Sequence, residues 1–218
     1  MVDSRKIPQA IQWHEGMLLA PQHFQQSNLR SEELLSYHMA STAPFYWGIR
    51  RLKIDPALLV GGVLRVLDLE AVMPDGLIVF HEHEQDGPLE IDISGCVEEI
   101  RLAPLTIHLA VPESVMSGFK GALSRYESVE GNNIYDNNTG EGELQIPRLK
   151  PCLTLLNTEN PPKKYSSFPL AKVAYKEEAF LLTNFVPPML SVPVNSPLGE
   201  MGSRIAKRIR EKAAYLAD

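Results

Sequence analysis

The chain lacks the features that mark several large classes of protein. It has two cysteines, Cys96 and Cys152, in 218 residues, too few for a disulfide framework and too far apart for zinc-ligand spacing. No run of about 18 consecutive apolar residues predicts a transmembrane helix, and the first residues lack the apolar core of a signal peptide. The net charge of -6 argues against nucleic acid as a partner. These absences predict a cytoplasmic chain whose cysteines are reduced and which does not insert into a membrane.

Sequence signatures of enzymes are equally scarce. The chain has no nucleophile elbow, no phosphate-binding loop and no dinucleotide fingerprint; Gly61-Gly62 lacks the third glycine and the Lys-Ser/Thr pair that such loops need. No motif places two carboxylates in a cleft. We therefore expect a protein that is not an enzyme and that binds no cofactor.

Proline, in contrast, is abundant, with 17 residues that recur from Pro44 to Pro197. Each proline disfavours a helix interior or a central strand position, so the middle of the chain is predicted to form short strands joined by irregular loops. Apolar runs bounded by turn residues predict strands over 49–54, 63–72, 77–82, 89–93, 105–111, 149–156, 170–175 and 179–182. Strict alternation over 63–72 would put Leu64, Val66 and Asp68 on one face. This spacing is typical of a β-sandwich or a β-barrel.

Two helices are predicted to flank the strands. Pro21 suits a first helical turn, and residues 22–40 contain neither Pro nor Gly. In this helix an apolar stripe can form from Phe24, Leu34, Leu35 and Met39. After Pro197 the spacing of the apolar residues predicts a second amphipathic helix, with the stripe Leu198, Met201, Ile205, Ile209 and Leu216. The Gly- and Asn-rich stretch 131–143 is predicted to be a long exposed loop.

The stretch His81-Glu82-His83-Glu84 is the strongest candidate for metal chemistry. In a strand, His81 and His83 would point to the same face and could chelate zinc. No third ligand stands at a matching spacing, so we expect no metal here. Ten acidic residues and no Lys or Arg lie between Asp68 and Glu99, a pattern that either keeps a sheet surface soluble, the favoured interpretation, or docks a basic partner. One alternative function is therefore a β-sandwich module that binds a small carbohydrate or peptide through His81, His83 and this acidic face.

The N-terminal segment carries a specific resemblance. Residues 11–26 read IQWHEGMLLAPQHFQQ, a long and compositionally unusual run that resembles the opening of the TssK family of type VI secretion baseplate proteins. Residues 44–49 (PFYWGI), 73–76 (MPDG) and 185–190 (FVPPML) resemble the same family. The resemblance thus runs from about residue 7 to the end of the chain.

The resemblance to the TssK family implies a fold and a function. It implies an N-terminal docking arm (1–20), an antiparallel β-sandwich "shoulder" with a leading helix (21–184), a Pro-rich linker (185–197) and the start of a helical neck (198–218). The fold would be mainly β and similar to the shoulder of phage receptor-binding proteins. The function would be that of a structural adaptor, a homotrimer in the full-length family, that docks onto the TssF–TssG wedge. A C-terminal region absent from this chain would contact the membrane complex proteins TssL and TssM.

The residues predicted to bind the wedge lie in the arm and at the start of the first helix. They are Trp13, His14, Glu15, Gly16, Met17, Leu18, Pro21, Gln22 and Phe24. Their large apolar side chains stand on a segment too short to bury them all, and Trp in particular is a typical interface anchor. The His, Glu and Gln side chains can add directional hydrogen bonds, and Gly16 permits a backbone turn. In the alternative interpretation, Trp13 and Phe24 cap the core of the sandwich.

Overall fold

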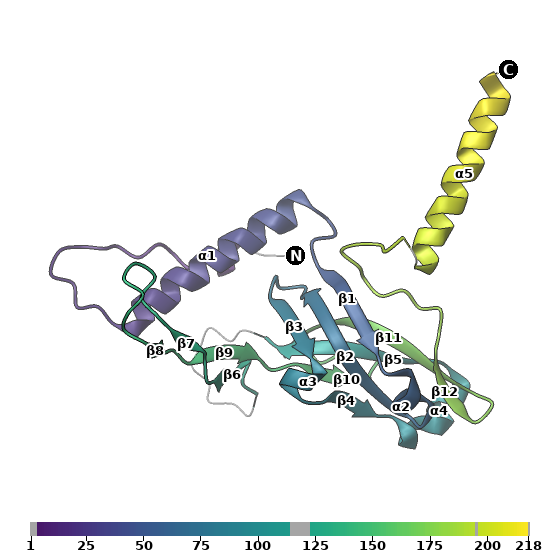
Figure 1. The fold of residues 1–218 in the computed structure, drawn as a ribbon, viewed down its shortest axis with the longest axis horizontal. Helices are drawn as coiled ribbons and strands as arrows, with labels where there is room; N and C mark the ends of the chain where they lie inside the picture. The colour runs from purple at the N-terminus through teal and green to yellow at the C-terminus, as the bar shows by residue number, and fades with distance from the viewer. Residues whose placement is uncertain (1–3, 114–122, 195, 218) are drawn as a thin grey trace.

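Two four-stranded antiparallel sheets pack face to face and form a β-sandwich (Figure 1). The computed structural model describes residues 4–113, 123–194 and 196–217. The first sheet has the order β1-β2-β3, with β4 also paired to β2, and comprises β1 (Gly48–Ile54), β2 (Val63–Val72), β3 (Ile78–Glu82) and β4 (Leu89–Asp92). The second has the order β10-β5-β11-β12 and comprises β10 (Thr154–Leu156), β5 (Leu105–Pro112), β11 (Tyr165–Lys176) and β12 (Ala179–Leu182). The predicted mainly β, antiparallel fold is confirmed.

The longest strand of the first sheet contains an irregularity that the alternation pattern did not predict. Leu64 and Val66 point into the core, as expected, but the next buried residue is Leu69 and not Asp68. The pairing of β1 with β2 shifts register at this point, since Lys53 pairs with Asp68 and Ile54 with Val66. One extra residue in a strand reverses the faces beyond it. The bulge therefore keeps apolar residues in the core along the whole strand and leaves Asp68 outside.

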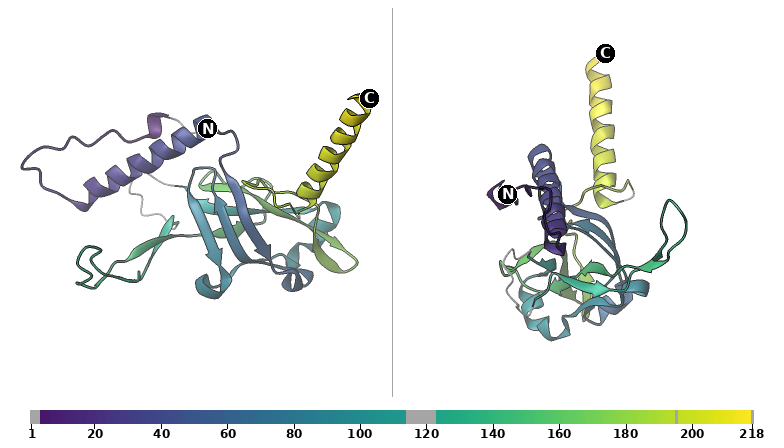
Figure 2. Two further views of the ribbon diagram at one scale, coloured as in Figure 1. Left: turned by 45° about the horizontal axis from the view of Figure 1, so that its top comes forward. Right: turned by 90° about the vertical axis from the view of Figure 1, so that its left-hand side faces the viewer.

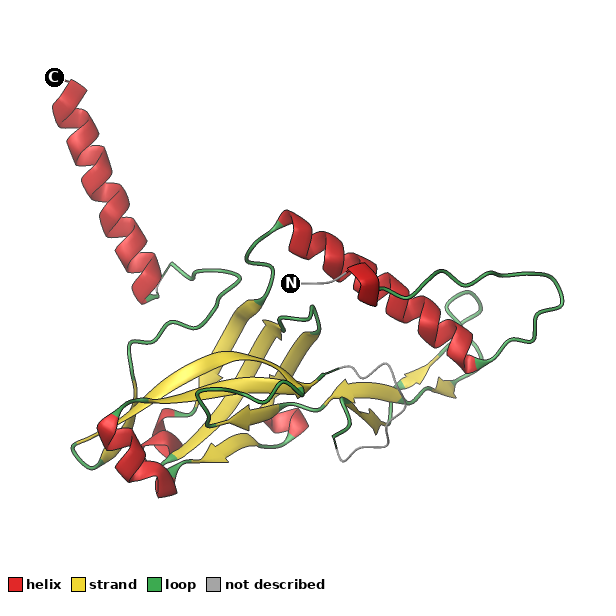
Figure 3. Ribbon diagram, turned by 180° about the vertical axis from the view of Figure 1, so that it is seen from behind, coloured by secondary structure: helices red, strands yellow, loops and turns green. Residues whose placement is uncertain are grey.

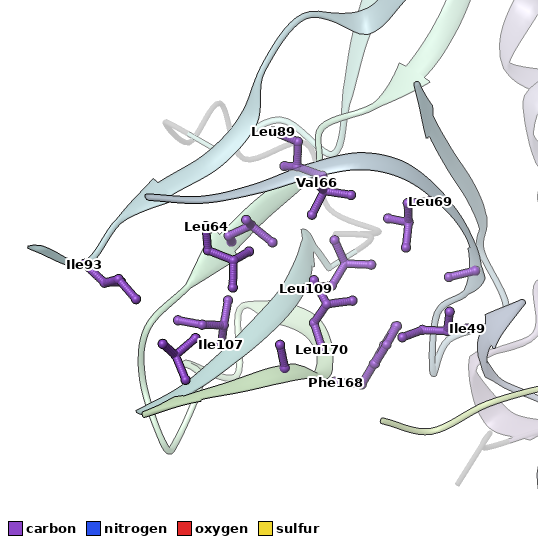
Figure 4. Close-up of a cluster of buried hydrophobic side chains, with 14 of the residues drawn as sticks. Ile49, Leu64, Val66, Leu69, Leu89, Ile93, Ile107, Leu109, Phe168 and Leu170 are labelled. Carbon is purple, nitrogen blue, oxygen red and sulfur yellow. The ribbon is translucent and has the colours of Figure 1, made fainter. Parts of the chain in front are cut away.

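The core lies between the two sheets (Figure 4). Its fully buried side chains from the first sheet include Ile49, Leu64, Val66 and Leu69, and those from the second include Ile107, Leu109, Phe168 and Leu170. The Trp47 ring, which precedes β1, packs on Phe168 with 5.8 Å between the ring centroids. Since interdigitating apolar side chains from two sheets exclude water, this cluster is the main source of the sandwich's stability.

Short helices close the ends of the sandwich. They are α2 (Pro56–Val60), α3 (His83–Asp86) and α4 (Val97–Leu102), together with the 3-10 turn η2 (Ser94–Cys96); a further 3-10 turn, η1 (Ser4–Lys6), lies in the N-terminal arm. The Asp55 carboxylate begins α2 by accepting hydrogen bonds from the backbone N–H groups of Ala57 and Leu58, a common N-cap arrangement. Buried Leu59 and Ile100 add α2 and α4 to the core.

The two long helices lie outside the sandwich, as Figures 2 and 3 show. Helix α1 (Pro21–Thr42) and helix α5 (Pro197–Ala217) agree closely with the predicted helices. None of the residues of α1 is buried, and all of them are described. In α5, which projects from the sandwich in every view, Met201, Ile205 and Ile209 are about half-exposed or more. These helices therefore contribute little to the folded core.

A thin ribbon extends from one side of the sandwich. It is built from the pair β6 (Tyr126–Val129) and β9 (Arg148–Pro151) and the pair β7 (Asn133–Ile134) and β8 (Leu144–Gln145). The predicted loop 131–143 lies mostly at the tip of this ribbon. The single strand predicted over 149–156 is wrong, because β9 and β10 belong to different sheets.

The Pro-rich stretch before α5 contacts the sandwich at β11, where Lys172 Nζ lies 5.8 Å from the Phe185 ring centroid, and at the start of β1. The Ile49 N–H donates to the Pro188 carbonyl and the Leu190 N–H donates to the Ile49 carbonyl, both at 2.8 Å. Residues 185–190 therefore add to the edge of β1, while the domain boundaries at 20, 184 and 197 stay a prediction. Within the described parts of the chain, no helix combines the length and apolar character needed to cross a membrane.

Candidate interaction surface

The N-terminal arm folds back along α1. The Arg30 guanidinium donates to the Pro8 carbonyl, and the Trp13 ring lies 6.0 Å from the His23 ring and 6.4 Å from the Phe24 ring, centroid to centroid. After Trp13 the arm loops out beyond the start of the helix (Figure 1). The arm is thus held by α1 at two places, and its tip, residues 14–19, extends past them.

Glycine makes the turn at the tip possible. Gly16 has φ +76°, a conformation that other residues adopt only with strain, and the Met17 N–H donates to the His14 carbonyl across the turn (3.4 Å). The backbone N–H of Ala20 donates to Nδ1 of His23 (3.1 Å), so a histidine side chain satisfies a backbone donor at the start of α1. The predicted turn at Gly16 is confirmed.

The arm and one face of α1 present large apolar side chains to solvent. Trp13 is 51% exposed and Leu18 87% exposed, and Leu19 and Phe24 are more than half exposed. Phe24 shares its face of α1 with the exposed Leu35 and Met39. The arm surface, as we call it, comprises Trp13, Leu18, Leu19, Phe24, Leu35 and Met39. Exposed large apolar side chains of this kind are typical of surfaces that contact another protein.

Most of the predicted binding residues are accessible in the structure. His14, Glu15, Gly16, Pro21 and Gln22 are exposed, and Met17 is half-buried. The alternative, in which Trp13 and Phe24 cap the sandwich core, is wrong, because Trp13 packs on α1 and both rings stay about half-exposed. Sequence reasoning missed Leu19. It also did not assign Leu35 and Met39 to the site, although the apolar stripe predicted for the first helix already contained both residues. Their role in binding a partner remains a prediction.

The two histidines at the end of β3 are not arranged as a chelating pair. The strand ends at Glu82, and His83 begins α3, so the predicted same-face geometry is wrong. His81 is buried, and its Nε2 has no hydrogen-bond partner among the described residues. Burial lowers the pKa of His81, and Asp86, whose Oδ2 lies 3.8 Å from Nδ1, partly opposes that effect. His83 instead places Nδ1 3.2 Å from the Gly87 carbonyl.

A surface hollow of about 380 Å³ lies beside these histidines. Its walls include both basic and acidic side chains, among them Arg51, Lys53, Asp68 and Glu82. Within residues 4–113, 123–194 and 196–217, no cluster of three or more His, Cys, Asp or Glu side chains is arranged to bind a metal ion.

Five of the ten acidic residues in the stretch 68–99 form ion pairs with basic residues from elsewhere in the fold. Its ion pairs are Arg51–Asp68 (2.6 Å), Arg50–Glu70 (3.2 Å), Arg65–Glu90 (2.6 Å), Arg125–Asp75 (2.8 Å) and Lys150–Asp86 (2.9 Å). Because these carboxylates already have cationic partners, the stretch is less suited to bind a basic partner than its sequence indicated. The favoured interpretation, a solvated sheet surface, agrees better with the structure.

A sandwich with an exposed apolar arm and two projecting helices is a protein that offers surfaces to other proteins. The sequence profile of the family described as "Bacterial Type VI secretion, VC_A0110, EvfL, ImpJ, VasE" matches residues 23–218. The chain therefore belongs to this type VI secretion family, the TssK family.

One relative and two solved structures illustrate the similarity. The chain is 26% identical over 215 residues to the type VI secretion system baseplate component TssK1 of Pseudomonas aeruginosa, covering 94% of this chain and 47% of the relative. It thus spans about half the length of the curated relative it matches.

The structures share the fold at low sequence identity. The baseplate complex from the type VI secretion system matches with TM-score 0.78 and 21% identity over 95% of this chain and 68% of that one. The TssK-TssF-TssG baseplate subcomplex, solved by cryo-electron microscopy, matches with TM-score 0.70 and 21% identity. The match covers 87% of this chain and 64% of the chain in that structure.

Proposed function

We propose that this chain is the part of a type VI secretion baseplate protein that docks onto neighbouring baseplate subunits, and that it does so through the arm surface. The exposed arm surface is the observation that carries this proposal. The relative TssK1 is a baseplate component, and one structure of the same fold is a TssK-TssF-TssG subcomplex; both support the proposal.

The partners we propose for the arm and the sandwich are the wedge proteins TssF and TssG. The chain would act as a non-enzymatic adaptor in the cytoplasm, trimeric in its full-length form. A region outside this chain would reach the membrane complex proteins TssL and TssM. These finer statements follow from the resemblance of the arm motif to the TssK family.

The chemistry of the arm surface is that of a protein interface. Interface energy concentrates in a few large side chains that are surrounded by polar groups. Here Trp13, Leu18 and Phe24 supply the apolar area, while His14 and Gln22 stand beside them and are exposed. The glycine turn projects Leu18 outward, where a partner pocket could enclose it completely. The alternative ligand-binding function has less support, since His81 is buried and His83 lies near the backbone.

Binding of purified TssF–TssG from the same bacterium to the full chain tests the proposal. Leu18→Asp should weaken binding by about tenfold or more, because a charge cannot enter an apolar pocket without loss of affinity. Leu102→Asp is a matched control, since Leu102 on α4 is 90% exposed and Leu18 is 87% exposed. Both variants should melt like the parent. Equal affinity of the two variants would refute docking through the arm.

A further inference from the structure

Three segments that are distant in sequence come together at the start of β1, where residues 44–49 contact each of the other two. They are residues 44–49, between α1 and β1; residues 73–76, between β2 and β3; and residues 185–190, before α5. We call them together the joint. All three resemble the TssK family in sequence, yet none belongs to the arm surface.

The first set of contacts connects α1 to the β2–β3 turn. The Tyr46 hydroxyl donates to the Pro74 carbonyl (2.9 Å), and the Ser36 hydroxyl donates to the Asp75 carbonyl (3.3 Å). Gly76 lies directly against the helix, because a Cβ atom there would be 2.6 Å from Oγ of Ser36. The turn therefore supports α1 at its C-terminal half, away from the tip of the arm at Gly16.

The second set of contacts connects the start of β1 to the segment that leads to α5. Ile49 exchanges two backbone hydrogen bonds with this segment, one to Pro188 and one from Leu190, each 2.8 Å long. Gly48 makes the approach possible: its φ is +136°, and a Cβ atom would lie 2.7 Å from the Pro188 carbonyl oxygen. A side chain at position 48 would push the two backbones apart.

The joint is itself anchored in the core. Ile49 is fully buried, and Trp47 packs on Phe168. The Asp75 carboxylate accepts from the Arg125 guanidinium (2.8 Å), which also donates to the Pro112 carbonyl at the end of β5. In contrast, α1 has no buried residue of its own. A helix without core contacts takes its direction from the contacts at its base.

We propose that the joint fixes the direction in which α1 leaves the sandwich and the place from which the segment leading to α5 leaves it, with Tyr46 and Gly48 as its positioning residues. The arm surface then keeps a set position relative to the sandwich. The link to docking rests on the proposed function above. The geometric part does not, because it concerns distances within one chain.

Distances between spin labels in the full chain test the geometric part. Labels would be placed on α1 (Gln26→Cys), on α4 of the sandwich (Glu98→Cys) and on α5 (Ala213→Cys), two at a time, with Cys96 and Cys152 replaced by Ser. Labelled protein is diluted with unlabelled protein so that only distances within one chain are read. Electron–electron double resonance then gives the distance distribution for each pair of elements.

Two substitutions should change different distances. Tyr46→Phe removes one hydroxyl and should broaden the α1–sandwich distribution, leaving the α5–sandwich distribution unchanged. Gly48→Ala should shift the α5–sandwich distance by several ångströms, because it pushes residues 185–190, which lead to α5, away from β1. If Gly48→Ala does not fold, Leu190→Pro removes the N–H that donates to Ile49 and should have the same effect.

Matched controls separate these effects from general perturbation. Tyr37→Phe removes a hydroxyl from α1 outside the joint, and Gly95→Ala adds a Cβ where no atom lies within 4 Å. Neither should change any distribution. Unchanged distances in folded Tyr46→Phe together with unchanged distances in folded Gly48→Ala or Leu190→Pro would overturn the proposal.

Binding to TssF–TssG tests the link to docking. Tyr46→Phe should weaken binding severalfold, because the partner must then fix a helix that the hydroxyl held in place before binding, while Tyr37→Phe should not. If Leu18→Asp leaves binding intact, docking through the arm is wrong, but the spin-label distances still decide the role of the joint. If Leu18→Asp weakens binding and Tyr46→Phe changes the distances without changing affinity, the joint does not position the arm for docking.

Discussion

The sandwich and the arm–α1 region use the same kinds of apolar residue in opposite ways. Phe168 in the sandwich is 1% exposed, whereas Phe24 on α1 is 55% exposed. Leu69 and Leu109 are fully buried between the sheets, whereas Leu18 and Leu19 face solvent. The sandwich has two layers that cover each other, but a loop lying on one helix has no second layer. Under the proposed function, another molecule would supply the cover that the arm surface lacks.

The largest expected effect comes from opening the core. Phe168→Ala should lower the free energy of unfolding by about 3–5 kcal/mol, because it removes a buried ring and leaves a cavity. Phe24→Ala, the same change on α1, should alter it by less than about 0.5 kcal/mol. Urea denaturation of both variants measures the difference. Equal destabilisation would mean that the arm–α1 region belongs to the core after all.

Deletion of residues 1–20 tests the difference between the sandwich and the arm–α1 region by removing the arm. The sandwich should stay folded with an unchanged urea midpoint, because its core residues begin at Ile49. Binding to TssF–TssG should be lost, since Trp13, Leu18 and Leu19 leave with the deleted segment. Circular dichroism and a binding titration on the same sample give both answers. A truncated protein with normal affinity would contradict the docking role.

The pH dependence of stability should come from the sandwich and not from the arm. Burial lowers the pKa of both His81 and His108, with Asp86 and Glu159 respectively opposing it in part. Since the unfolded chain then binds protons more readily, stability is fully present above the unfolded histidine pKa of about 6.5 and falls as the pH drops below it.

Chemical denaturation between about pH 5 and pH 8 measures this loss. The double variant His81→Gln/His108→Gln should weaken the dependence on pH. His38→Gln, on the exposed face of α1, should leave it as in the parent. A parent protein that is equally stable across this range would contradict the role of the buried histidines.

The smallest expected effect concerns metal. Purified protein should carry no stoichiometric zinc, because His81 is buried in the sandwich and His83 begins α3. Elemental analysis of the parent and of His81→Ala should give the same low value. About one zinc per chain in the parent, lost in His81→Ala, would contradict this expectation.

Much of the sandwich was predictable because local patterns specify strands. Turn residues such as Pro74 and Gly76 bound the apolar runs, and the structure places β2, β3 and β5 close to where these runs stand. The bulge at Leu67–Asp68 was not predictable, since it depends on how β1 pairs with β2. The separation of β9 from β10 depends in the same way on their partners in different sheets.

The interaction surface was predictable in part. The arm motif identified Trp13, Leu18 and Phe24 as candidates, and the structure leaves them exposed. The stripe through Leu35 and Met39 was visible in the sequence, but helical periodicity says only that two residues share a face. Whether a second layer covers that face depends on the path of the rest of the chain.

The local elements follow from the sequence alone. Apolar runs between turn residues predict the strands, Pro21 and the apolar spacing after Pro197 predict the two helices, and Gly16 predicts a turn because it has no side chain. The tertiary structure decided which apolar faces are covered. It paired the acidic stretch with Arg50, Arg51 and Arg65, and it brought residues 44–49, 73–76 and 185–190 into one joint. The physical reason is that backbone preferences act over a few residues, whereas burial and ion pairing depend on segments that meet only after the chain has folded.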